Sequence, residues 1–178
     1  MKRLNSKKKG KRGENELANI LNKKFGEGRF KRVPFSGAIT GGKNRNANQN
    51  FEMKEAYTSD IAAPADFNFV IEHKFYADIS FWELLSEKSN WNEWINQVNG
   101  DADFVNKIPL LVIKYNRHDR IALIPFQYLI KYSMTKPEIE SKIHEMAKSF
   151  IWKSFSVVSL QSLLDLPLDF WFTERTTQ

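Results

Sequence analysis

The spacing of apolar residues changes along the chain and predicts a helix followed by three strands. Residues 13–25 have a helical stripe made of Leu17, Ala18, Leu21 and Phe25. Gly26 and Gly28 follow, as expected where a helix ends. Apolar runs with β-formers then predict strands at 29–35, 59–63 and 68–76, with turn formers between them.

A second set of elements follows the third strand. Ser80 and Glu83 have the spacing of a capping box and predict a short helix. Asn90 and Glu93 repeat this spacing before a helical stripe of Trp91, Trp94, Ile95 and Val98. Strands are expected at 109–115 and 121–125. The resulting order, αβββαββ, indicates an α/β fold.

The last third of the chain reads as an addition to this core. Thr135, Pro137 and Glu138 have the pattern of a helix start, and Ile139, Ile143, Met146, Ala147 and Phe150 supply its apolar face. The aromatic-rich stretches 151–158 and 168–173 fit either strands or a packed tail, so the addition would cover a sheet edge or form a dimer surface. We therefore divide the chain into a basic disordered tail (1–12), a core (13–126) and an α+β C-terminal extension packed on it (127–178).

The basic character of the chain is concentrated at its N-terminus. The net charge is +6, but residues 1–45 hold fourteen Lys/Arg and three Glu, and the remaining residues carry an acidic excess. A basic arm gains affinity for a polyanion by releasing counterions, although a solubilising tail would have the same composition. We expect DNA contacts from a set of basic residues: Lys7, Lys8, Lys9, Lys11, Arg12, Arg29, Lys31, Arg32, Lys43 and Arg45.

Residues 41–58 are rich in Gly and Asn and lack a period, which predicts a mobile loop. Because this loop precedes Asp60, a candidate catalytic residue, it would place Lys43 and Arg45 at the mouth of a catalytic site. There they would contact phosphate groups. A tolerated insertion is the alternative interpretation.

The candidate chemistry lies around the third strand. Asp60 precedes Glu72 by twelve positions, and Lys74 follows Glu72 by two. Because side chains alternate along a strand, Glu72 and Lys74 face one side and His73 the other, where a helix is expected to cover it. Two acids and a lysine at a sheet edge suit metal-dependent phosphodiester hydrolysis. Asp66 is the less favoured alternative to Asp60, because it lies in the turn before the strand.

This pattern resembles the PD-(D/E)xK nuclease superfamily, with Ser59-Asp60 in place of Pro-Asp and Glu72-His73-Lys74 as the E-x-K. Residues 10–38 are similar to the N-terminus of archaeal-type and phage Holliday junction resolvases, and the resemblance extends over about residues 10–125. It implies a restriction-endonuclease-like core, in which a mixed central sheet is flanked by helices. It also implies a glutamate on the first helix that completes the metal site. Glu14 lies on the apolar stripe and Glu16 points away from it, so Glu14 is favoured.

The resemblance also implies a role for each candidate residue. Asp60, Glu72 and the His73 backbone carbonyl would hold Mg²⁺, or Mn²⁺ as a substitute, and Glu14 would reach this ion or a second one. Lys74 would orient or deprotonate the attacking water. Gln97 would lie near the metal-bound water or else be a plain exposed glutamine. Ser36 would hold a phosphate or a metal-bound water, or simply form a turn.

The expected function is therefore a Mg²⁺-dependent endonuclease acting on branched DNA as a homodimer, since two incisions need two sites. A general or restriction/repair-type nuclease and a non-catalytic DNA-binding protein are the alternatives. The chain has no cysteine and no apolar run long enough to span a membrane. We expect no membrane partner and a cytoplasmic location, in the host cytoplasm if a phage encodes the protein.

Overall fold

The computed structural model describes residues 6–34, 58–78, 81–86 and 89–173. The elements up to residue 125 are α1 (Ser6–Phe25), β1 (Lys31–Arg32), β2 (Ile61–Ala62), β3 (Phe69–Tyr76), α4 (Phe81–Leu85), α5 (Asn90–Val105), β4 (Ile108–Tyr115) and β5 (Arg120–Pro125). The later elements are α6 (Phe126–Ser133), η2 (Pro137–Ile139), α7 (Glu140–Ser149), β6 (Ile151–Trp152), β7 (Phe155–Ser159), α8 (Leu160–Leu164) and α9 (Leu168–Trp171).

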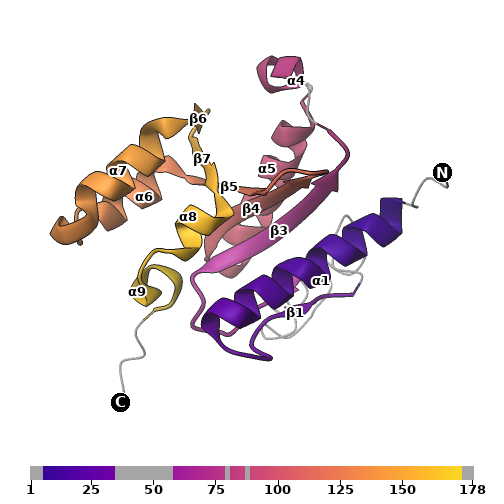
Figure 1. The fold of residues 1–178 in the computed structure, drawn as a ribbon, viewed down its shortest axis with the longest axis horizontal. Helices are drawn as coiled ribbons and strands as arrows, with labels where there is room; N and C mark the ends of the chain where they lie inside the picture. The colour runs from indigo at the N-terminus through magenta and orange to yellow at the C-terminus, as the bar shows by residue number, and fades with distance from the viewer. Residues whose placement is uncertain (1–5, 35–57, 79–80, 87–88, 174–178) are drawn as a thin grey trace.

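Five strands form a mixed sheet in the order β3-β4-β5-β7-β6 (Figure 1). β3 and β4 are parallel, with His73 opposite Val112, and α5 makes the crossover between them. The remaining neighbours are antiparallel. β1 and β2 form a separate antiparallel pair beside β3. The predicted α/β class with a mixed sheet flanked by helices is confirmed.

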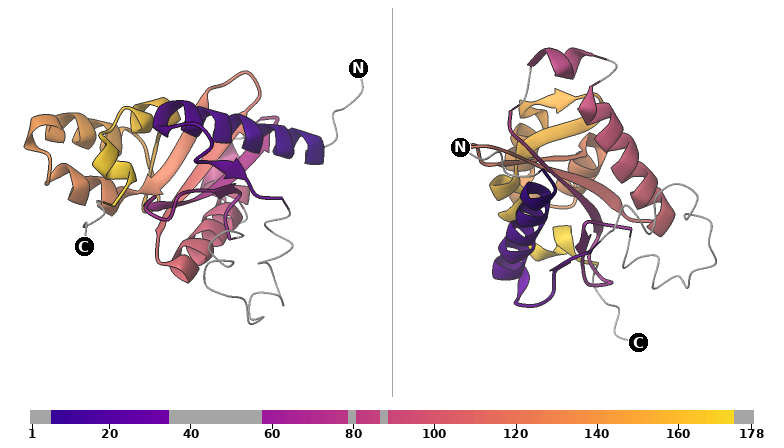
Figure 2. Two further views of the ribbon diagram at one scale, coloured as in Figure 1. Left: turned by 90° about the horizontal axis from the view of Figure 1, so that it is seen from below. Right: turned by 90° about the vertical axis from the view of Figure 1, so that its right-hand side faces the viewer.

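Each face of the sheet is covered by a different set of helices (Figures 1 and 2). The stripe of α5 packs on one face, against Leu111, Ile113 and Leu123. α1 and the C-terminal helices cover the other face, where Ile71, Val112 and Ala122 lie. Alternation along β3 therefore sends Val70 toward α5 and Ile71 toward α1.

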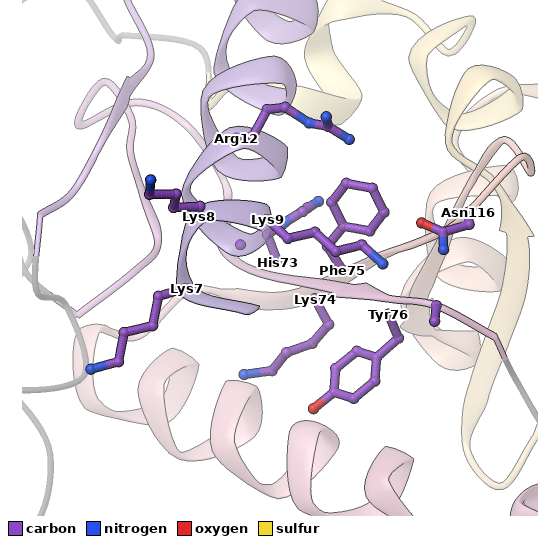
Figure 3. A pocket seen from close by; sticks show the side chains of 11 residues that line it. Lys7, Lys8, Lys9, Arg12, His73, Lys74, Phe75, Tyr76 and Asn116 are labelled. Atoms are coloured by element: carbon purple, nitrogen blue, oxygen red, sulfur yellow. The ribbon is translucent and has the colours of Figure 1, made fainter. Parts of the chain in front are cut away.

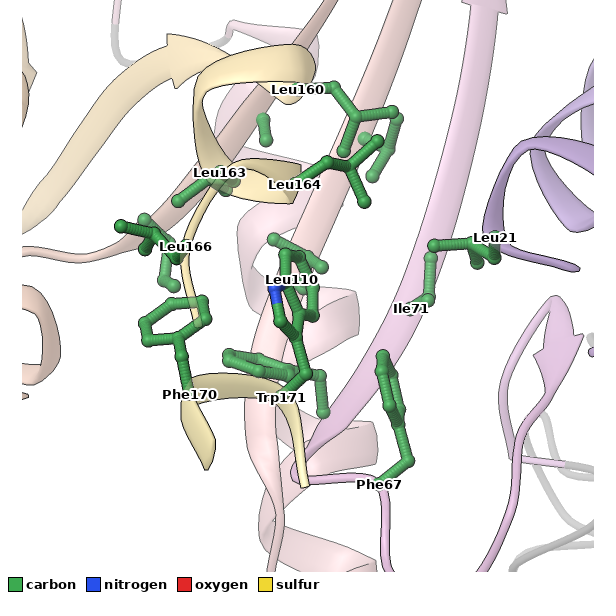
Figure 4. Packing of buried hydrophobic residues seen from close by; sticks show 14 of the residues in the cluster. Leu21, Phe67, Ile71, Leu110, Leu160, Leu163, Leu164, Leu166, Phe170 and Trp171 are labelled. Atoms are coloured by element: carbon green, nitrogen blue, oxygen red, sulfur yellow. The ribbon is translucent and has the colours of Figure 1, made fainter. Parts of the chain in front are cut away.

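The C-terminal extension is part of the sheet and of its main core. β7 pairs with β5 along five residues, so residues 151–159 form strands, one of the two alternatives left open by the sequence. Residues 168–171 form α9, whose Trp171 is fully buried and stacks on Phe67 with ring centroids 5.9 Å apart (Figure 4). The pattern did not predict α6, and the helix expected from Thr135 begins as the single turn η2 before α7. In the described part of the chain, no helix is both long and apolar enough to span a membrane.

The first helix begins at Ser6, so the expectation of a disordered tail is wrong for residues 6–12. The reason is that the lysines have apolar stems and nearby partners that offset their mutual repulsion. Lys9 Nζ lies 4.3 Å from the centroid of the Phe75 ring, and Arg12 pairs with Glu16 one turn later at 3.3 Å. The basic residues are thus held in a helix above the end of β3.

Gly13 allows α1 to pack directly on β3. A Cβ atom at this position would lie 2.4 Å from His73 Cε1 and 2.9 Å from Phe75 Cδ1. His73 is buried and Phe75 is half-buried beneath α1, so the two side chains cannot both move aside cheaply. Gly13 therefore sets the distance between β3 and the helix α1, which carries the adjacent Glu14.

We expect Gly13→Ala to destabilise the protein by about 1–3 kcal/mol, because the added methyl group forces α1 away from β3. Gly10→Ala is the matched control, since its Cβ would meet only Glu14 Oε1 at 3.7 Å and alanine is favoured inside a helix. Urea unfolding of both variants measures the difference. Equal stability of the two variants would contradict the proposed close packing.

Candidate active site

Ser59 and Asp60 fasten the chain before β2 to the edge of β3. The Ser59 hydroxyl lies 2.8 Å from the Ile71 carbonyl oxygen and accepts a hydrogen bond from the Ile71 amide at 3.2 Å. Asp60 donates its amide to the same carbonyl at 3.1 Å. Two positions further along, the His73 amide donates to Asp60 Oδ2 at 2.9 Å. The Asp60 carboxylate is therefore held against the E-x-K segment.

The backbone carbonyl of His73 faces the same edge as Asp60. In an extended strand, the amide and carbonyl groups of one residue point to the same neighbour. Since the His73 amide bonds Asp60, the carbonyl oxygen lies on that side too. It is thus positioned as the sequence interpretation requires, although its role as a metal ligand stays a prediction.

Glu72 and Lys74 lie on the α5 face of β3 and contact each other. Lys74 Nζ donates to Glu72 Oε1 at 2.5 Å and to Gln97 Oε1 on α5 at 3.1 Å. The Glu72 side chain is only 4% exposed. The structure thus brings together Glu72, Lys74 and the predicted Gln97.

His73 has the opposite orientation, as the strand alternation predicts. Its imidazole is buried beneath Gly13 of α1. Burial lowers the pKa of His73 to about 3, and the charges of Arg120 and Lys74 act in the same direction. The neutral ring therefore packs as a core group, while its backbone faces the site.

Glu14 of α1 approaches the cluster from the other side and is held by Arg32 of β1, whose Nε lies 2.5 Å from Glu14 Oε2. The alternative acid, Glu16, bridges Arg12 and Arg120 and points away from Asp60. The structure therefore places Glu14, and not Glu16, in the acidic cluster, in agreement with the helical stripe.

The acids of this cluster repel one another. Burial and, second to it, the nearby Asp60 carboxylate raise the pKa of Glu72 to about 8 against the opposing effect of Lys74. Burial and Asp60 also raise the pKa of Glu14, while Arg32 opposes them. Burial lowers the pKa of Lys74, but Glu72 outweighs this effect, so the net shift is upward and the ammonium persists at neutral pH. The cluster holds more negative than positive charge.

This donor set fits a hard divalent cation. Within the described ranges, no three Asp, Glu, His or Cys side chains are arranged as a complete metal cage. A site here would instead use Asp60, Glu72 and the His73 carbonyl oxygen, with water completing the shell, as is usual for Mg²⁺. The added positive charge would relieve the repulsion that raises the two glutamate pKa values.

Asp101 is a further acid of the site that the sequence interpretation missed. It lies on α5 four residues after Gln97, is buried, and contributes to the raised pKa of Glu72. A buried aspartate on the face that carries Gln97 is visible in the sequence as an i, i+4 pair.

The predicted DNA-contacting residues separate into distinct places. Lys7, Lys8, Lys9 and Arg12 line a groove together with Lys74, and Lys11 and Lys31 are exposed. Arg29 instead pairs with Asp66 at 3.6 Å beyond the far end of α1, so neither residue joins the acidic cluster. Arg32 is occupied by Glu14. Ser36, Lys43, Arg45 and nearly all of the predicted loop at 41–58 lie outside the described residues.

The site and fold define a nuclease of the PD-(D/E)xK class. A family model described as "Phage putative PDDEXK endonuclease" matches residues 5–163, and the chain belongs to this family. The match reaches α8, further than the resemblance seen in the sequence. A search of curated proteins gave no match. Among solved structures, the chain is similar to the Holliday junction resolvase Hjc of Archaeoglobus fulgidus, with 13% identity, a TM-score of 0.37, and coverage of 86% of this chain and 90% of the resolvase.

We expect Glu72 to make the metal-free protein less stable as the pH rises from about 4.5 to 8. The folded state keeps the Glu72 proton up to about pH 8, whereas the unfolded chain releases it near 4.5, so rising pH favours unfolding across this window. Glu72→Gln lacks this contribution. Unfolding in EDTA at pH 5, 6.5 and 8 should show wild type losing stability relative to the variant, and parallel pH profiles would contradict the burial of the proton.

Proposed function

We propose that the protein is a Mg²⁺-dependent endonuclease that hydrolyses phosphodiester bonds in branched DNA. One observation carries the proposal: Asp60, Glu72 and Lys74 meet at one edge of β3, with the His73 carbonyl facing the same edge. Membership of an endonuclease family supports the reaction class. Mn²⁺ is the expected substitute, because it accepts the same oxygen ligands.

In this mechanism Asp60, Glu72 and the His73 carbonyl oxygen would hold the metal ion, and Glu14 would complete the site directly or through water. The ion, when bound, stabilises charge on the phosphate and lowers the pKa of water. Lys74, whose pKa Glu72 raises, would orient or deprotonate the attacking water and neutralise charge on the phosphate oxygens. Gln97 accepts a hydrogen bond from Lys74 and thereby fixes the position of Nζ.

Branched DNA is proposed as the substrate on the similarity of residues 10–38 to the resolvases. A homodimer would supply the two active sites that paired incisions require, by the two-fold symmetry common among oligomers. The basic groove beside Lys74 supports binding of a nucleic acid strand next to the acids.

We expect Mg²⁺-dependent cleavage of a labelled four-way junction in preference to linear duplex, and a loss of about 100-fold or more in Lys74→Ala. Lys148→Ala on α7 is the matched control, because this exposed lysine lies on another helix and should leave the rate unchanged. Gel analysis of junction, flap, single strand and duplex measures both effects.

Each other result changes the assignment. Equal cleavage of all substrates would replace the branched-DNA preference with a general nuclease activity. Binding without cleavage in Mg²⁺ or Mn²⁺ would overturn the enzymatic proposal.

A further inference from the structure

A groove of about 710 Å³ lies between the first part of α1 and the C-terminal half of β3, and it reaches Asn116 after β4 (Figure 3). Its wall is the first part of α1, and five cationic side chains line it: Lys7, Lys8, Lys9, Arg12 and Lys74. Among the described residues, no carboxylate is part of this lining. The groove therefore continues the candidate active site into a region of positive charge, which suits a polyanionic strand.

Tyr76 lies at the end of this groove on the same face of β3 as Lys74. Figure 3 shows both side chains leaving the strand on one side, while Phe75 leaves on the other. Two residues of strand cover about 7 Å, which is comparable to the reach of one extended nucleotide. The Tyr76 ring contacts Trp94 with centroids 4.6 Å apart, and the residue as a whole is 41% exposed. It is thus a supported aromatic ring with an accessible surface.

We propose that Tyr76 stacks on the base next to the scissile phosphate, while the lysines of α1 bind the phosphates of the same strand. An aromatic ring is able to stack on a base only where a neighbouring base does not already cover it, so this contact favours an unpaired nucleotide. The occupant is therefore a DNA strand with an unstacked base at a branch, flap or end. This inference rests on the proposed nuclease function and gives it a source of selectivity.

A second copy of the chain is the competing occupant, because an edge strand also pairs with other strands. Two-fold pairing along this edge would bring the lysines at positions 7–9 of both copies toward the same groove. Like charges at such close range repel, whereas phosphates would neutralise them. Charge complementarity therefore favours DNA at this edge.

The test is fluorescence of 2-aminopurine placed in turn at each nucleotide around the branch, with protein bound in EDTA so that no cleavage occurs. Wild type should quench one position next to the branch, because a stacked 2-aminopurine loses emission. Tyr76→Phe should retain this quenching and Tyr76→Trp should deepen it. Tyr76→Leu should restore most of the emission. Phe150→Leu is the matched control, since Phe150 is 44% exposed on another part of the molecule.

A kinetic measurement distinguishes stacking from a structural role. In Mg²⁺, Tyr76→Leu should raise KM for branched DNA by about 10-fold, with little change in kcat. A variant with damaged folding would instead lose kcat as well and show a lower unfolding midpoint. In that case the Tyr76→Phe and Tyr76→Trp variants decide whether an aromatic ring is needed.

Quenching at no position, or quenching that Tyr76→Leu retains, would overturn the inference. A halved molecular mass for Tyr76→Leu in sedimentation would also overturn it and assign the edge to a second copy. Tyr76-dependent quenching in a protein that cleaves nothing would support the inference on strand binding while the proposed nuclease function failed. Cleavage of branched DNA that no Tyr76 substitution alters would support the proposed nuclease function and overturn the inference on Tyr76.

Discussion

The hydrogen bond from the His73 amide to Asp60 determines where the acidic cluster forms. Ser59 holds the chain on Ile71 just before this point, and β2 itself is only two residues long. Beyond His73, no described strand continues the pairing, so the edge of β3 becomes accessible. The acids, the His73 carbonyl and the basic groove all lie where that pairing stops.

The convergence of these acids is electrostatically unfavourable in the absence of a cation, as expected if the cluster binds a metal ion. Glu72 is buried next to Asp60, with Glu14 and Asp101 nearby. Among the residues that the structure describes, Lys74 and Arg32 provide positive charge within the cluster. A purely structural cluster would gain stability from pairing each acid with a cation or from replacing it with an apolar residue. Raised pKa values at converging acids are typical of functional sites, where a ligand supplies the missing charge.

Most of the core could be predicted from the sequence, because apolar residues recur there with a clear helical or strand period. Alternation along residues 69–76 correctly placed Glu72 and Lys74 opposite His73, and the stripe of α1 correctly separated Glu14 from Glu16. Other features depended on contacts that a single sequence does not show. The start of α1 at Ser6 depends on Phe75, which is distant in sequence. α6 was missed because its eight residues follow β5 directly, without a turn former or a side-chain cap to mark the start.

The C-terminal third explains why the candidate site lies at this edge of the sheet. β7 pairs along β5, and the two-residue β6 then ends the sheet on that side. Trp171 and Phe170 cover the core next to Phe67 and Phe69, near the N-terminal end of β3. The C-terminal half of β3 is consequently the part of the long edge strand that the described elements leave accessible. A nucleic acid strand needs such an open approach to Lys74. The extension leaves it open, because it pairs with β5 on the far side of the sheet and packs beside Phe67 near the N-terminal end of β3.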